Sequence, residues 1–200
     1  TFTLTLDGNG IATLDDSYLT TSDNCGVESI IFGNLNTLVS GTTLDFTCAD
    51  AGSTTPIGIL VTDDNGNQNQ CIVFVLIQDT ELPTIAECGE TFTLTLDGNG
   101  TATFNDSYLT TSDNCGVQSI AFENTNTGTL GTTLDFTCAD IGTSVPVEVT
   151  VTDDNGNISQ CEIFVSVQDL ELPRIAECGQ MISIELDENG MATLDTSAIT

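Results

Sequence analysis

Cysteine is the residue type with the most regular spacing in this sequence. The intervals between successive cysteines are 23, 23, 17 and 27 residues before the pattern begins again. The eight are Cys25, Cys48, Cys71, Cys88, Cys115, Cys138, Cys161 and Cys178. Zinc sites usually combine CxxC pairs with histidine, and neither is present. Four cysteines in each period therefore predict two disulfides and an oxidising, extracytoplasmic environment.

Aspartate and asparagine form a second set of residues that could do chemistry. TDDNGN occurs at 62–67 and 152–157, and SDNCG occurs at 22–26 and 112–116. Asn-Gly between alternating strands indicates a hairpin, because both residues tolerate positive φ. Carboxylate and amide oxygens are also the ligands that calcium prefers. The two interpretations are compatible, so these segments are expected to be turns that are able to bind a cation.

The charge balance excludes several classes of function. Thirty acidic residues face one basic residue, Arg174, which gives a formal net charge of -29 without any histidine. Nucleic acids and anionic membrane surfaces both require clustered Lys and Arg, so neither is an expected partner. Hydrolase triads and phosphoryl transfer also lack their usual residues. We therefore expect no enzyme activity. No apolar run approaches the roughly 18 residues that span a bilayer, so we also expect no membrane insertion.

The sequence repeats with a period of 90 residues. Positions 1–90 and 91–180 are identical at 63 of 90 places, and a third copy continues from Met181. We therefore predict three parts: a repeat without its first strand at 1–82, a complete repeat at 83–172, and the beginning of a third at 173–200. Repeats of this size suit one small core that is reinforced by disulfides.

Alternating apolar and polar residues predict an all-β fold. Thr91 to Leu96 alternates Phe and Leu with Thr, and similar alternation marks 134–138, 147–153 and 161–169. The segment 106–112 is long enough for one short helical turn. About seven strands in ninety residues indicate an immunoglobulin-like β-sandwich, with a small closed barrel as the alternative. The linker QDxELPxIAEC has proline and no flexible spacer, so we expect the repeats to be arranged end to end.

The order of motifs resembles a known module. PxIAxC is followed by LDxNGxAT, SDNCG, FTCADxG, VTDDNGNxxxC and VxVQD. This order is similar to the hyalin-repeat (HYR-like) modules of giant secreted Bacteroidota surface proteins, such as gliding adhesins of the SprB type. The resemblance covers the whole chain. It implies an immunoglobulin-like fold, export to the cell surface and a role in a filament or stalk, including gliding motility.

The immunoglobulin-like topology allows the disulfides to be paired. Cys88 begins the first strand and Cys161 begins the last strand, and these strands are parallel neighbours in such a sandwich. Cys115 and Cys138 flank the segment that varies most between repeats, so a bond there would close its base. We therefore predict Cys88 with Cys161, Cys115 with Cys138 and, by periodicity, Cys25 with Cys48.

The same topology predicts a calcium site at the junction between repeats. The DGNG turn of the first repeat and its linker should lie beside the upper loops of the second repeat. Almost no basic residue offsets the carboxylates that would meet there, and a divalent cation would neutralise them. The expected calcium ligands are Asp7, Asp79, Glu81, Asp113, Asp153, Asp154 and Asn157.

These observations favour a non-enzymatic structural repeat in the stalk or filament of a secreted cell-surface adhesin. Its expected partners are neighbouring repeats of the same chain, together with an external surface or glycan that the sequence does not identify. The alternative is a carbohydrate-binding or other ligand-binding module, with Tyr18 and Tyr108 as stacking platforms. The absence of Trp makes that alternative weaker.

Overall fold

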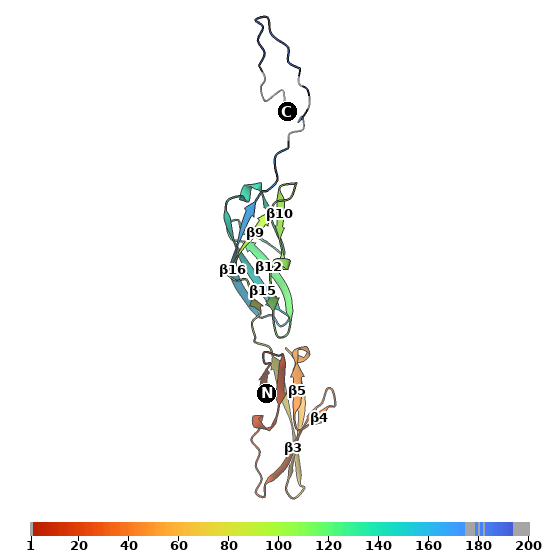
Figure 1. The fold of residues 1–200 in the computed structure, drawn as a ribbon. Coiled ribbons are helices and arrows are strands. Elements are labelled where there is room, and N and C mark those ends of the chain that lie inside the picture. Colours follow the sequence, from red (N-terminus) through yellow and green to blue (C-terminus); the bar gives the residue numbers. More distant parts are fainter. Residues whose placement is uncertain (1, 175–178, 180, 182, 194–200) are drawn as a thin grey trace. The chain divides into compact units, whose positions relative to one another are not determined.

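The computed structural model describes residues 2–174, 179, 181 and 183–193 (Figure 1). Its contacts divide the chain into two units, 1–169 and 170–200. The larger unit contains two β-sandwiches, one for each of the first two repeats, and each has its own core of buried residues.

The first repeat has seven strands in two sheets. They are β1 (Phe2–Thr5), β2 (Ile11–Leu14), β3 (Val27–Asn34), β4 (Ser40–Gly41), β5 (Leu44–Thr47), β6 (Thr54–Asp63) and β7 (Gln68–Gln78). One sheet has the order β1-β7-β6-β3-β4, and the other is the pair β2-β5. β1 runs parallel to β7, whereas the other pairs are antiparallel.

The second repeat has the same arrangement with two short additional strands. Its strands are β8 (Thr84–Ile85), β9 (Thr91–Thr95), β10 (Thr101–Phe104), β11 (Thr111–Ser112), β12 (Val117–Asn124), β13 (Thr129–Gly131), β14 (Leu134–Thr137), β15 (Ser144–Asp153) and β16 (Ile158–Gln168). The sheets are β13-β12-β15-β16-β9, β10-β14 and β11-β8. A parallel pairing of the first long strand with the last, over a separate two-stranded sheet, is the immunoglobulin-like sandwich that was predicted, and not a closed barrel.

The helices among the described residues are four single turns. They are η1 (Asp16–Tyr18), η2 (Cys48–Asp50), η3 (Asp106–Tyr108) and η4 (Cys138–Asp140). The turn η3 confirms the short helical turn expected within 106–112. No helix in the described part of the chain is long and apolar enough to cross a membrane.

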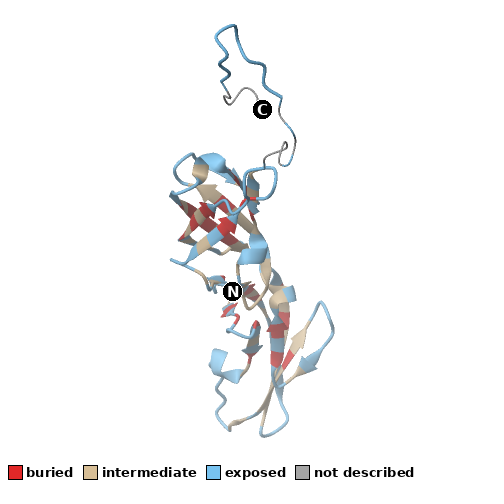
Figure 2. Ribbon diagram, turned by 45° about the horizontal axis from the view of Figure 1, so that its top comes forward, coloured by how far each residue is buried: buried red, intermediate tan, exposed pale blue. Residues whose placement is uncertain are grey.

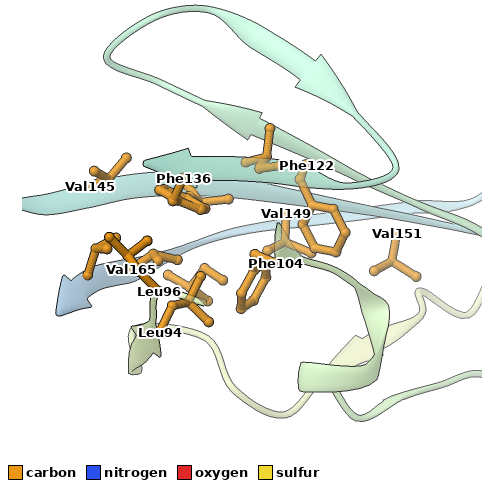
Figure 3. Packing of buried hydrophobic residues seen from close by; sticks show 13 residues of the cluster. Leu94, Leu96, Phe104, Phe122, Phe136, Val145, Val149, Val151 and Val165 are labelled. Carbon is orange, nitrogen blue, oxygen red and sulfur yellow. The ribbon is translucent and has the colours of Figure 1, made fainter. Parts of the chain in front are cut away.

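Strand alternation positions the core, as the sequence pattern predicts. In LDFT at 134–137, Leu134 and Phe136 are buried whereas Asp135 and Thr137 are exposed. Figure 2 shows buried residues along the strands and exposed residues in the turns. Figure 3 shows Phe104, Phe122 and Val149 converging between the sheets, and all three are 0% exposed. β12, which supplies Phe122, is not among the strands that the sequence pattern predicted.

The TDDNGN turns are the predicted hairpins, since they join the antiparallel pairs β6-β7 and β15-β16. The turn at 7–10 joins β1 to β2, which belong to different sheets. Its Gly10 N donates to Asp7 O at 2.8 Å and Asp7 N donates to Ile11 O at 2.9 Å. Gly10 has φ of 72°, whereas Asn9 does not have positive φ, so only the glycine of this turn is left-handed.

The smaller unit, 170–200, contains the start of the third repeat. None of its described residues belongs to a strand. The turn at Asp187 nevertheless forms, because Asp187 Oδ1 accepts from Asn189 N at 2.8 Å and from Met191 N at 2.9 Å.

Candidate functional site at the junction of the two repeats

The bond between Cys88 and Cys161 fastens the first segment of the second repeat to its last strand. Their Cα atoms are 5.6 Å apart, and 73 residues separate them in sequence. β16 runs parallel to β9, which is the geometry that predicted this pair. The predicted Cys88–Cys161 disulfide is therefore present.

The second disulfide joins the two repeats and contradicts the other predicted pairings. Cys48 bonds Cys115 with a Cα–Cα distance of 5.3 Å, so the predicted Cys115–Cys138 and Cys25–Cys48 pairs are wrong. Cys115 precedes β12, which begins opposite Asp153, whereas Cys138 follows β14, which ends opposite Thr101. These two cysteines thus lie at opposite ends of one sandwich, too far apart to bond.

The remaining described cysteines are unbonded and exposed. They are Cys25, Cys71 and Cys138. Each lies 90 positions from a bonded cysteine: Cys115, Cys161 and Cys48 respectively. Cys178 lies outside the described residues.

Close packing surrounds the disulfide that joins the repeats. Gly10, in the turn before β2, has φ of 72°, and a Cβ atom built on it would lie 3.0 Å from Asn114 O and 2.5 Å from Cys48 Sγ. Asn114 Nδ2 donates to Asp7 O at 2.9 Å. The first repeat therefore contacts the 112–116 loop of the second through the disulfide from Cys48 in η2, through a hydrogen bond to the turn at 7–10, and through a glycine of that turn that leaves room for both.

Three carboxylates meet beside this disulfide. Asp79 follows β7, Asp113 lies in the 112–116 loop and Asp153 is the last residue of β15. Each offers one carboxylate oxygen, and the three oxygens lie within 4.8 Å of one another. Asp79 is 8% exposed and Asp153 is 0% exposed. Elements far apart in the sequence thus bring together two buried aspartates and one that is partly buried.

The hydrogen bonds of these carboxylates leave some of their oxygens unpaired. Asp153 Oδ1 accepts from Asn155 N and from Asn157 N, both at 2.8 Å. Asp79 Oδ1 accepts from Glu81 N at 3.2 Å and from Asn114 Nδ2 at 3.3 Å. Among the residues that the structure describes, three buried side-chain atoms have no hydrogen-bond partner: Asp79 Oδ2, Asp113 Oδ2 and Asn114 Oδ1.

Electrostatic repulsion makes this arrangement costly without a counterion. Two unit charges 4.8 Å apart repel by roughly 3 kcal/mol at an effective dielectric constant of about 20. The chain contains no lysine or histidine, and its one arginine is Arg174 in the smaller unit. The protein supplies little positive charge to compensate the three carboxylates.

The other predicted calcium ligands are not part of this group of three. Asp7 Oδ1 accepts from Asn9 N at 2.9 Å and from Ile11 N at 3.0 Å within its own turn. Asn157 Nδ2 donates to Asp153 Oδ2 at 2.7 Å and to Asp79 O at 3.4 Å. Glu81 and Asp154 are exposed. The predicted ligand set did not include Asn114, although it stands in the SDNCG motif beside Asp113.

Hydrogen bonds within the exposed turns lower the pKa of the aspartates that hold these turns. The bonds from Ile11 and Asn9 hold the pKa of Asp7 below its ordinary value of 3.8. The side-chain amide of Asn67, followed by backbone donors, lowers the pKa of Asp63 in the same way. These carboxylates are therefore structural acceptors within their own turns.

Tyr108, one of the two tyrosines of the alternative, glycan-binding hypothesis, is partly covered by neighbouring rings. Tyr108 stacks on Phe104 with ring centroids 4.8 Å apart and an interplanar angle of 16°. It also meets Phe92 edge to face at 6.0 Å. Tyr108 is 40% exposed and Tyr18 is 43% exposed. Because Phe104 covers one face of the Tyr108 ring, only the other face is able to stack on a sugar.

The chain is similar in fold to several solved structures. No protein-family model matches it, and no curated protein does. The insect immune protein hemolin aligns over 84% of this chain and 45% of its own, at 11% identity and a TM-score of 0.47. The structure of Dpr11 IG1 bound to DIP-gamma aligns over 84% of this chain and 94% of its own, at 10% identity and a TM-score of 0.39. The titin domains z1z2 in complex with telethonin align over 86% of this chain and 93% of their own, at 10% identity and a TM-score of 0.37. At these identities the likeness concerns the fold alone, and at these TM-scores we draw no further argument from it.

Proposed function

We propose that this chain is a non-enzymatic, structural segment of an extracellular protein, in which tandem immunoglobulin-like repeats form the stalk or filament of a cell-surface adhesin. The observation that carries the proposal is the Cys48–Cys115 bond, which links one repeat covalently to the next. A protein that works through an isolated binding domain has no need of such a bond. A protein that must keep a defined spacing between distant ends gains stiffness from it.

Three further features support this function. The disulfides fit an oxidising compartment outside the cytoplasm. The net charge of -29 favours separation of molecules over lateral aggregation. The order of motifs resembles the HYR-like modules of giant secreted Bacteroidota proteins, and from that resemblance we propose a cell-surface location and a role in adhesion that extends to gliding motility.

The test is to remove the bond between repeats and measure the freedom of the junction. In Cys48→Ser/Cys115→Ser we expect small-angle scattering to show a broader distribution of maximum dimensions than in the oxidised parent. We also expect proteases to cleave faster at the linker beginning at Asp79. Cys25→Ser/Cys138→Ser is the matched control, because it removes two exposed, unbonded cysteines. Equal scattering and equal cleavage in both variants would contradict the structural role of the bond.

The glycan-binding alternative has its own measurement. If the chain were a lectin that uses Tyr108, a glycan array would show reproducible binding that Tyr108→Ala removes. We expect no such binding, because Phe104 already stacks on this ring.

A further inference from the structure

We propose that Asp79, Asp113 and Asp153 bind one calcium ion at the junction of the two repeats. The cluster is not an ordinary solvated acidic surface. Asp153 is 0% exposed and Asp79 is 8% exposed, so water has little access to either carboxylate. Oδ2 of Asp79 and Oδ2 of Asp113 are buried without a hydrogen-bond partner. Buried carboxylate oxygens without donors are costly, and a cation would satisfy both.

The chemistry of the donors selects a hard divalent ion. All three donors are carboxylate oxygens, and the nearby sulfurs of Cys48 and Cys115 are consumed by their disulfide. Soft or borderline ions such as copper and zinc favour thiolate and imidazole ligands, which are missing here. Calcium and magnesium, in contrast, are bound through oxygen.

The spacing of the oxygens fits calcium. Calcium–oxygen bonds of about 2.3–2.6 Å allow two ligands of one ion to lie up to roughly 5 Å apart. The three oxygens lie within 4.8 Å of one another, which meets this limit. Magnesium holds its ligands at about 2.0–2.1 Å in a strict octahedron and keeps several of its waters, so a buried trio of this width suits it less well.

The position of the site gives the ion a mechanical consequence. Asp79 begins the linker after the first repeat, whereas Asp113 and Asp153 belong to two loops of the second repeat. One ion would therefore fasten the linker to both loops, beside the Cys48–Cys115 bond. The proposal concerns these three residues alone and does not depend on whether the chain forms a stalk.

The affinity should be in the range of extracellular calcium modules. Three carboxylates do not complete the six to eight oxygen ligands that calcium takes, so water or backbone oxygen must supply the others. An incomplete protein ligand set predicts a dissociation constant of about 0.1–1 mM. Calcium bound only to the folded state then raises the melting temperature by about 2–5 °C at a few millimolar.

Two variants separate a specific site from the general attraction of an acidic protein for cations. Asp113→Asn removes one ligand, whereas Asp23→Asn makes the same change of charge in the identical SDNCG loop of the first repeat. Both aspartates accept from the amide of the cysteine two residues later at 2.8 Å, and an asparagine Oδ1 preserves that bond. Asp113→Asn therefore changes the group of three carboxylates, whereas Asp23→Asn does not, and both variants keep the hydrogen bond of their turn.

The experiment is calcium titration of the oxidised chain by calorimetry, at constant ionic strength and with magnesium as competitor. We expect one site per chain, at least tenfold weaker binding in Asp113→Asn, and no change in Asp23→Asn. Thermal melts should show the calcium-dependent rise in the parent and in Asp23→Asn only. If Asp113→Asn does not fold, Asp79→Asn provides the second ligand variant. Equal binding by the ligand and control variants, or a melting shift no larger than that of magnesium, would overturn the proposal.

Discussion

The two copies of TDDNGN have the same sequence and different surroundings. In each, the first aspartate accepts hydrogen bonds from the amides two and four residues later, so the local turn is the same. Asp63 is nevertheless partly exposed, whereas Asp153 is 0% exposed. The difference arises because Asp153 lies against Asp79, which follows the last strand of the preceding repeat. The motif determines its own turn, and the neighbouring repeat determines whether that turn is buried.

The edge of the last strand differs between the repeats in the same way. In the second repeat, Gly89 N donates to Glu162 O at 2.8 Å, and Phe164 N donates to Glu90 O at 2.8 Å. In the first repeat, Phe74 and Cys71 stand where the second repeat has Phe164 and Cys161; Phe74 is 52% exposed and Cys71 is unbonded. The segment 84–90 thus covers in the second repeat an edge whose counterpart residues are exposed in the first.

Removal of the Cys88–Cys161 bond should have the largest effect on the difference between the last-strand edges of the two repeats. Cys88→Ser/Cys161→Ser should lower the free energy of unfolding of the second repeat by about 4 kcal/mol, since a loop of 73 residues is released in the unfolded chain. Denaturation followed by hydrogen exchange, which resolves the two repeats, measures this loss. Cys71→Ser is the control and should leave the first repeat unchanged. A loss below about 1 kcal/mol would show that packing, and not the bond, holds this edge.

Much of the fold could be predicted from the sequence because its determinants are local. The alternation in LDFT places Phe136 inward, and Asp-x-Asn-Gly closes its own turn. The Cys88–Cys161 pair followed from the sandwich topology. The Cys48–Cys115 bond did not, because the prediction considered only pairs within one repeat.

The candidate site was predicted in part for the same reason. Its general position followed from the linker and the upper loops. Which carboxylates meet could not be read from residue type, because Asp7 and Asp63 are aspartates just as Asp79 is. Asp7 uses its oxygens within its own turn, whereas Asp79 Oδ2 is left without a donor. That distinction requires the three-dimensional contacts.

A peptide should cover the exposed strand residues of the first repeat in the way that 84–90 covers those of the second. A peptide with the sequence of 82–90, carrying Ser in place of Cys88, should bind beside β7. At 100 times its dissociation constant it would stabilise the first repeat by about 3 kcal/mol. Hydrogen exchange should show protection at Phe74. A peptide with Asp in place of Ile85 is the control, since Ile85 packs against the core of the second repeat. Protection of the second repeat instead of the first would contradict this interpretation.

The two repeats also differ at one core position, and exchanging the residue there should have a smaller effect on stability. Phe104 packs against Phe92 and Phe122, at 5.2 and 5.3 Å between ring centroids, whereas the first repeat has Leu14 at this position. Phe104→Leu should destabilise the second repeat by about 1 kcal/mol through lost contacts and a small void. Urea denaturation followed by hydrogen exchange provides the measurement. Leu14→Phe is the reciprocal variant, and an equal loss there would show that each core is fitted to its own residue.

The smallest expected effect is the acid response of the exposed turn at Asp63. The hydrogen bond from the Asn67 side chain, followed by backbone donors, lowers the pKa of Asp63 below its ordinary value of 3.8. Because the folded pKa lies below the unfolded one, the turn contributes stability above the unfolded pKa and loses it as the pH falls through the folded pKa. NMR titration of the carboxyl carbon should therefore give a midpoint below 3.8, and Asn67→Ala should move that midpoint upward. Asn65→Ala is the matched control, since Asn65 contributes its backbone amide and not its side chain. A midpoint that Asn67→Ala leaves in place would show that the backbone amides alone hold the carboxylate, and that the exposed turn differs from the buried one only in its neighbours.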